Sequence, residues 1–180
     1  FGIVLIREGE EAGSDVAQPY MVGTVARIVA VDAHDDGSMN IQVTGEGRFR
    51  IRHLDDEPGH LVALVEGVYE HSVRAEDEPD ADRIVHAVRE EFEALVKRLF
   101  ARQDFAVSLV LPKDPYVLSF TIAGLLPMAN LDRQRLLETT DTIDRMRDLQ
   151  PILRDHLLES APGGLVQVEG DELRDWQSPN

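Results

Sequence analysis

The stretch "SMNIQVTGEGRFRIRHL", residues 38–54, decides the fold because its side chains alternate in character over more than a dozen positions. Successive side chains of a strand point to opposite faces, so a period of two predicts a strand with one buried and one wet face. The residues expected on the buried face are Met39, Ile41, Val43, Gly45, Gly47, Phe49 and Ile51. The "GEG" in the middle predicts a bulge where the sheet curls toward closure.

The flanking segments extend this strand into an antiparallel meander over residues 1–74. Three further strand-like runs, "FGIVLIR", "PYMVGTVARIVAV" and "HLVALVEGVYE", are separated by short stretches rich in Gly, Asp and Pro. Such spacing is typical of strands joined by tight connections.

The period changes after an acidic linker at residues 75–82. Apolar residues then recur every three or four positions, which predicts a helical lobe over residues 83–159 and an α+β fold class. Asp114 is the expected N-cap of an apolar helix that starts at Pro115 and stops at Pro127. Further helical pieces are expected over residues 131–137 and from Asp141 onward, and residues 160–180 form a tail.

Composition excludes several classes of function. The chain has 180 residues, a net charge of −16 and no cysteine, so it has no disulfide and no thiolate metal site. Residues 1–78 hold 6 basic and 16 acidic groups, which argues against a nucleic-acid partner because such binders need clustered positive charge. No apolar run reaches the length of a membrane helix, so we expect a cytoplasmic protein without a membrane partner.

Recognisable catalytic motifs are missing from this chain. It contains no phosphate-binding loop, no nucleophile elbow and no H-E-x-x-H zinc motif. The acidic run "EDEPDAD" lacks the glycine and the terminal glutamate of a calcium loop, so a solvated linker is favoured. We therefore expect no catalytic residues, no cofactor and no metal.

Three arginines, Arg48, Arg50 and Arg52, occupy the face expected to be wet. They could contact nucleic acid, receive an acidic segment of a partner, or pair with carboxylates across the sheet. A hairpin turning near residue 58 would bring Glu66 opposite or diagonal to Arg50. Cross-strand pairing is the favoured interpretation, and the arginines remain candidate partner contacts.

Together these motifs resemble the Lon substrate-binding domain family, the N-terminal domain of the ATP-dependent protease La. The motifs that carry the resemblance are "VGTVA" at residues 22–26, "GEGRFRI" at residues 45–51 and "LLE" at residues 136–138, and it covers about residues 1–158. Within them Gly23, Gly45, Gly47, Phe49 and Ile51 are the expected structural signature.

The resemblance implies a PUA-like antiparallel β pseudo-barrel followed by a C-terminal helical bundle. It implies a non-catalytic module that binds unfolded or tagged polypeptide, supports assembly into a homo-oligomer and works with an ATPase or protease. It also implies a first barrel strand upstream of Phe1. The ATPase and peptidase domains of the family are not in this chain, so a stand-alone or excised domain is expected. A PUA-like nucleic-acid binder, disfavoured by the charge, and an orphan small-ligand sensor stay open as alternatives.

Overall fold

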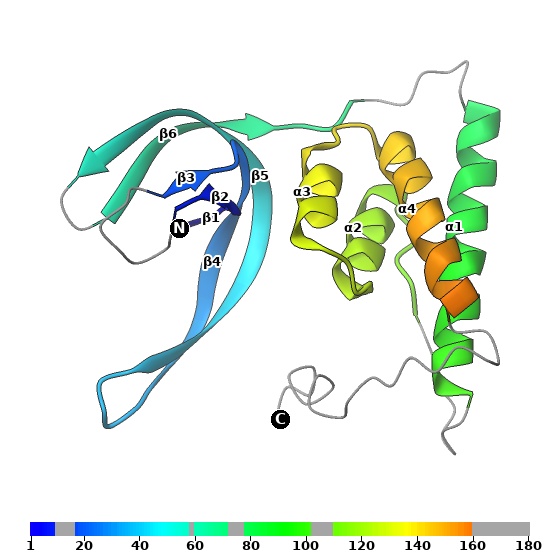
Figure 1. Cartoon of the computed structure of the whole chain (residues 1–180), viewed down its shortest axis with the longest axis horizontal. Coiled ribbons are helices and arrows are strands. Elements are labelled where there is room, and N and C mark those ends of the chain that lie inside the picture. Colours follow the sequence, from blue (N-terminus) through cyan, green and yellow to red (C-terminus); the bar gives the residue numbers. More distant parts are fainter. Residues whose placement is uncertain (10–16, 58–59, 72–77, 102–109, 160–180) are drawn as a thin grey trace. The chain divides into compact units, whose positions relative to one another are not determined.

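The chain runs through strands first and helices afterwards, in a mixed α+β arrangement with antiparallel sheets (Figure 1). The computed structural model describes residues 1–9, 17–57, 60–71, 78–101 and 110–159. The strands are β1 (Gly2–Ile3), β2 (Ile6–Glu8), β3 (Gln18–Pro19), β4 (Val22–Ala33), β5 (Met39–Glu57) and β6 (His60–Val68). The helices are α1 (Glu78–Phe100), α2 (Pro115–Leu125), α3 (Asn130–Glu138) and α4 (Thr142–Glu159).

These elements form two compact units, and the division differs from the predicted one. Unit 1 combines Phe1–Ser72 with Pro127–Thr142, and unit 2 combines Val73–Leu126 with Ile143–Asn180. The segment that contains α3 thus packs with the strands, although the sequence placed it in the helical lobe. A helical period identifies a helix but not the neighbour that covers its apolar side.

The main sheet of unit 1 has the strand order β1-β4-β5-β6, and β2 and β3 form a separate antiparallel pair. Consecutive hairpins join β4, β5 and β6, as the sequence predicts for a meander. β4 and β5 are 12 and 19 residues long, well above the five or six that are usual for a strand. The β4–β5 hairpin therefore extends past the strands that flank it, as Figure 1 shows for the light-blue and cyan ribbons.

Three register shifts interrupt the sheet, and one of them lies at the predicted position. Val25 pairs with Gly47 and Ala26 with Gly45, so Glu46 is the extra residue of a bulge. The other shifts lie between Ile28 and Ala30 and between Ile51 and His53. A bulge bends its strand and strengthens the local twist, which fits the curl expected at "GEG".

The alternation across this bulge does not mark one continuous buried face. Phe49 and Ile51 are buried as predicted, whereas Met39, Ile41 and Val43 are 61%, 45% and 38% exposed. The prediction that these three are buried is wrong. They lie in the part of the hairpin that runs past β1, because β1 pairs with β4 only at Val25 and Thr24.

The core of unit 1 joins the sheet to α3. Val22, Ala26, Phe49 and Ile51 are buried on the sheet side and Leu136 on the helix side. Nε2 of Gln134, itself buried, donates to the carbonyl oxygen of Val22 at 3.0 Å, so a hydrogen bond links α3 to β4.

Unit 2 is built on α1, α2 and α4. The side chain of Asp114 accepts a hydrogen bond from the backbone N–H of Tyr116 at 2.9 Å, which confirms the predicted cap and start of α2. α1 begins at Glu78, so part of the predicted linker is helical; proline and acidic residues are favourable in a first helical turn. The apolar positions predicted for these helices supply the core, including Val88, Phe92, Leu118, Ile122, Met146, Leu149 and Leu153.

Candidate functional site

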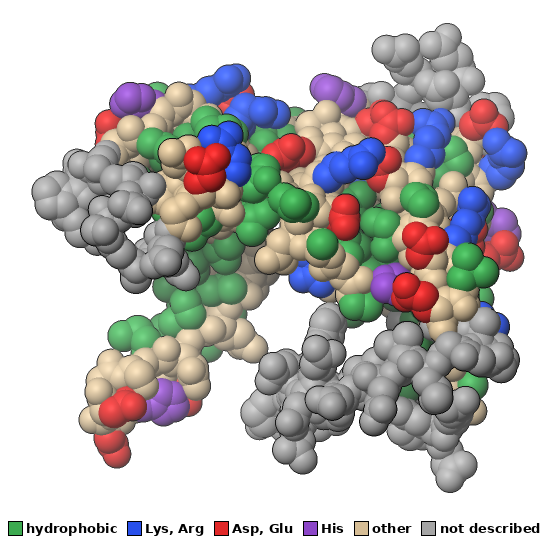
Figure 2. All heavy atoms as spheres, viewed as in Figure 1, with side chains coloured by type: hydrophobic (Ala, Val, Ile, Leu, Met, Phe, Trp, Pro, Cys, Tyr) green, Lys and Arg blue, Asp and Glu red, His purple; other side chains and the backbone are tan. Residues whose placement is uncertain are grey.

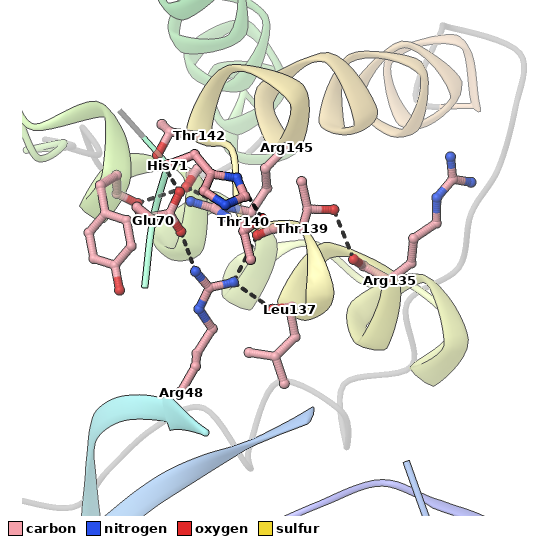
Figure 3. A network of polar contacts seen from close by, with 11 residues as sticks. Arg48, Glu70, His71, Arg135, Leu137, Thr139, Thr140, Thr142 and Arg145 are labelled. Carbon is pink, nitrogen blue, oxygen red and sulfur yellow. Dashed lines mark hydrogen bonds and ion pairs between the residues drawn. The ribbon is translucent and has the colours of Figure 1, made fainter. Parts of the chain in front are cut away.

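Arg48, predicted to face solvent, is only 8% exposed. Its Nη1 donates to the carbonyl oxygens of Leu137 at 2.7 Å and Thr139 at 2.8 Å, and its Nη2 forms an ion pair with Glu70 (Figure 3). The guanidinium thus binds carbonyl groups at the end of α3, where helices lack internal donors. The expectation of a wet Arg48 is wrong, because α3 and its following turn cover this end of the strand.

Glu70 connects Arg48 to the segment that follows α3. Its second carboxylate oxygen accepts a hydrogen bond from Oγ1 of Thr142 at 3.0 Å. Next to it, the backbone N–H of His71 donates to the carbonyl oxygen of Thr140 at 2.7 Å (Figure 3). The network joins β5, the end of the sheet and residues 137–142 within unit 1, and its geometry is that of a structural link.

The other two arginines lie closer to solvent. Arg50 is half-buried and pairs in register with Glu66, as expected, but the ion pair of Glu66 is with Arg52. The side chains of Arg52 and Glu66 are 56% and 47% exposed. The hydrogen bond and the charge of Glu66 raise the pKa of Arg52 above its usual range. This geometry fits the cross-strand pairing that the sequence favoured.

The signature glycines differ in how much space surrounds them. A Cβ on Gly23 would lie 2.5 Å from the carbonyl oxygen of Ile3 and 2.7 Å from Cζ of Phe49, so β1 and the phenyl ring approach the backbone closely. A Cβ on Gly47 would meet nothing within 4 Å, and one on Gly45 would meet only a side-chain methyl of Thr24 at 3.3 Å. Gly23 is therefore needed for packing, while Gly45 and Gly47 flank the bulge.

The projecting part of the β4–β5 hairpin, residues 27–44, is called the arm below. Cross-strand partners lie on the same face of a sheet, and three successive partner pairs of the arm are apolar: Ile28 with Val43, Val31 with Ile41, and Ala33 with Met39. These six residues are the apolar face of the arm, and all of them are exposed. Figure 2 shows hydrophobic side chains along this projection.

The opposite face and the tip of the arm are polar. The opposite face carries the partner pairs Arg27 with Thr44, Ala30 with Gln42, and Asp32 with Asn40. The turn at the tip contains His34, Asp35 and Asp36, and Figure 2 shows acidic and histidine side chains at the end of the projection. Hydrogen bonds from the side chain and the backbone of Ser38 lower the pKa of Asp36, so this carboxylate is ionised at neutral pH.

Sequence reasoning missed the arm as an exposed surface. Its alternation was interpreted as a buried face, because alternation alone does not reveal whether a second layer covers the strand. The length of the two hairpin strands was the one signal in the sequence that could have predicted this exposure. Two joined strands of 12 and 19 residues, around a Gly- and Asp-rich turn, extend past the flanking strands β1 and β6, which have 2 and 9 residues.

The described residues show no arrangement suited to metal chemistry. Within them, no group of three or more His, Asp or Glu side chains could hold a metal ion. Ser119 is buried in α2, where it donates to the carbonyl oxygen of Tyr116 at 2.7 Å and accepts from Nε of Arg145 at 2.9 Å. It has the role of a satisfied core hydroxyl. No helix in the described ranges is long and apolar enough to span a membrane.

Comparison with solved structures shows the same fold. The N-terminal domain of the Mycobacterium avium complex Lon protease superposes with a TM-score of 0.61 at 24% identity, covering 86% of this chain and 78% of that chain. The Lon N-terminal domain protein from Xanthomonas campestris gives 0.53 at 22% identity, covering 83% and 73%.

Comparison of sequences identifies the family. The Lon protease of Escherichia coli (strain K12) is 29% identical over 171 residues, covering 93% of this chain and 20% of that protein. The Lon protease of Aquifex aeolicus is 27% identical over 164 residues and also covers 20% of its protein. This chain thus spans about a fifth of the length of these relatives. Residues 1–155 match the family described as the ATP-dependent protease La (LON) substrate-binding domain, and the chain belongs to that family.

Proposed function

We propose that this domain binds extended, unfolded polypeptide along the arm of unit 1, and that it performs no chemistry itself. The observation that carries the proposal is the exposed apolar face of the arm, formed by three cross-strand pairs. Contiguous exposed apolar surface on a soluble domain is a common mark of an interaction site.

The backbone of the arm supports the same mode of binding. β4 and β5 pair with each other along the arm, but among the described strands none pairs with the outer edge of β4 beyond Ala26 or with the outer edge of β5 before Arg48. Both strands of the arm therefore present unpaired N–H and C=O groups at an edge, to which an extended chain can add as a further strand. Every second side chain of that added strand would extend the apolar face.

The family gives the proposal its context. The family is described as a substrate-binding domain, and the E. coli relative is named a protease. We propose that the polypeptides recognised here are unfolded or tagged proteins destined for an ATP-dependent protease, whether through a partner or an assembly of several copies. We also propose that the sheet closes into a PUA-like pseudo-barrel and that the helices form a bundle.

The arginines give little support to nucleic-acid binding. Arg48 is buried against Glu70, and Arg52 and Arg27 form ion pairs with Glu66 and Glu46. Paired in this way, they offer little charge for the release of counterions from a phosphate backbone.

Fluorescence anisotropy with a labelled, permanently unfolded protein tests the proposal. Replacing Val31 and Ile41 by threonine keeps β-branched side chains in the strands but makes the centre of the apolar face polar. At about 1 kcal/mol lost per residue, the double variant loses about 2 kcal/mol, so we expect roughly thirtyfold weaker binding. The folded form of the same labelled protein should bind far less tightly than the unfolded form.

A matched double variant separates the arm from other exposed apolar residues. Val62 and Val65 on β6 are 37% and 45% exposed, and replacing both by threonine changes composition to a similar extent outside the arm. We expect near wild-type binding for that control. The proposal is wrong if the domain does not bind unfolded protein, and the arm is the wrong site if both double variants weaken binding equally.

A further inference from the structure

Within the described residues, no cation forms an ion pair with the carboxylates at and beside the tip of the arm. Glu46, Glu66 and Glu70 each form an ion pair with an arginine. Asp35 and Asp36 in the turn, and Asp32 on the polar face beside it, have no Lys, Arg or His partner among the described ion pairs. The tip is therefore a concentration of uncompensated negative charge next to a face without charged side chains.

The dimensions of the arm place this charge within reach of a bound polypeptide. A strand rises about 3.3 Å per residue, so a chain of five or six residues covers the apolar pairs and ends beside the tip. Charges interact over roughly 8 Å at physiological ionic strength. One or two residues beyond the apolar segment would therefore sense the three carboxylates.

We infer that the arm selects extended segments whose alternate residues are apolar and which carry lysine or arginine directly beside that apolar run. This inference rests on the proposed function and specifies its ligand. A second copy of the chain suits the surface less well, because each copy has a net charge of −16 and the same acidic tip. Anionic membranes and nucleic acids would be repelled for the same reason.

The test uses three labelled peptides with one alternating valine–threonine core and blocked termini. They are flanked at both ends by two lysines, two glutamines or two glutamates, so the direction of binding does not matter. At 50 mM salt we expect the lysine peptide to bind about three- to tenfold more tightly than the glutamine peptide, and the glutamate peptide to bind least tightly. The differences should shrink at 0.5 M salt, where screening is strong.

Two matched triple variants locate the effect. Changing Asp32, Asp35 and Asp36 to asparagine removes the charge while keeping an oxygen that can accept the turn hydrogen bonds of Ser38 at position 36. We expect this variant to bind all three peptides with the affinity of the glutamine peptide. The control, Glu8→Gln with Asp55→Asn and Asp132→Asn, removes equal charge elsewhere in unit 1 and should keep the preference.

Each other outcome has a definite meaning. Equal affinities for the lysine and glutamine peptides overturn the inference but leave the proposed function standing. If both triple variants lose the preference for the lysine peptide equally, that preference arises from the net charge of the protein. The role of the tip is then overturned. If sedimentation shows a dimer that Ile41→Thr disrupts, a second copy occupies the arm and the inference is wrong. If neither the peptides nor unfolded protein binds, the proposed function fails as well.

Discussion

Replacing Arg48 by methionine should destabilise unit 1 strongly, although Arg50 and Arg52 at the next alternate positions of the same strand lie closer to solvent. The change removes the ion pair with Glu70 and two hydrogen bonds to carbonyl groups at the end of α3. Removing one partner of a buried ion pair costs about 3–5 kcal/mol because the other charge stays behind. The side chain of Glu70 is 21% exposed and also binds Thr142, which favours the lower limit of about 3 kcal/mol.

Urea unfolding followed by circular dichroism measures this loss, and thermal unfolding gives a second readout. A cost near 3 kcal/mol corresponds to a fall in Tm of roughly 6–12 °C for a chain of this size. Native-state hydrogen exchange should show lower protection of α3 amides, because Arg48 binds the carbonyl groups at that end of the helix.

Arg52→Met is the matched control, because Arg52 makes an ion pair on the same strand with its side chain 56% exposed. Exposed pairs contribute about 0.2–1 kcal/mol, so this variant should unfold almost as the parent does. The free energy of unfolding of Arg48→Lys should fall between those of the two methionine variants. Lysine keeps the positive charge but lacks the planar guanidinium that binds Glu70 and both carbonyl groups at once. If Arg48→Met costs no more than Arg52→Met, the guanidinium is not the buried link described here.

Two further substitutions and one titration test the packing, the capping and the ionisation of single residues. Gly23→Ala should cost about 1–3 kcal/mol in urea unfolding, because its Cβ would lie 2.5 Å from a backbone carbonyl of β1. Asp114→Ala should cost about 1 kcal/mol by the same measurement, because α2 loses its capping hydrogen bond. Asp36 should titrate by NMR below the ordinary pKa of an aspartate, because Ser38 donates hydrogen bonds to its ionised form. A lowered folded-state pKa gives stability above the unfolded value that is lost as the pH falls through the folded one, so any contribution of Asp36 disappears only in acid.

Each of these changes has a control on the same feature. Gly47→Ala places its Cβ in open space and should cost much less than Gly23→Ala; equal costs would contradict the close packing at Gly23. Asp114→Asn keeps the capping oxygen and should recover most of the loss. Ser38→Ala should return the pKa of Asp36 toward its ordinary value, and an unchanged titration would show that Ser38 is not the cause.

Local signals in the sequence were sufficient for most elements. The cap and proline at residues 114–115 placed the start of α2, and the glycines on either side of Glu46 placed a bulge. Both succeed because they depend on backbone geometry within a few residues. The family motifs at residues 22–26 and 45–51 were enough to identify the family, which the match over residues 1–155 shows.

Which side chains of β5 are buried could not be predicted from local sequence in the same way. The alternation of β5 is equally regular on both sides of Glu46, yet Phe49 and Ile51 are buried while Met39 and Ile41 are exposed. The difference arises from which other elements cover each half of the hairpin, and that depends on contacts between distant parts of the chain. For the same reason the exposed apolar face of the arm was not foreseen.

The sequence by itself determined the order of strands and helices, the bulge, the cap and the family, because each is written in residues that are close along the chain. Only the tertiary structure decided that α3 packs with the strands, that Arg48 is buried and that the arm is exposed. Arg48 shows the reason most clearly: the carbonyl groups it binds lie 89 and 91 residues away. An arginine at an alternating position has the same local pattern whether water or the end of a helix receives its side chain.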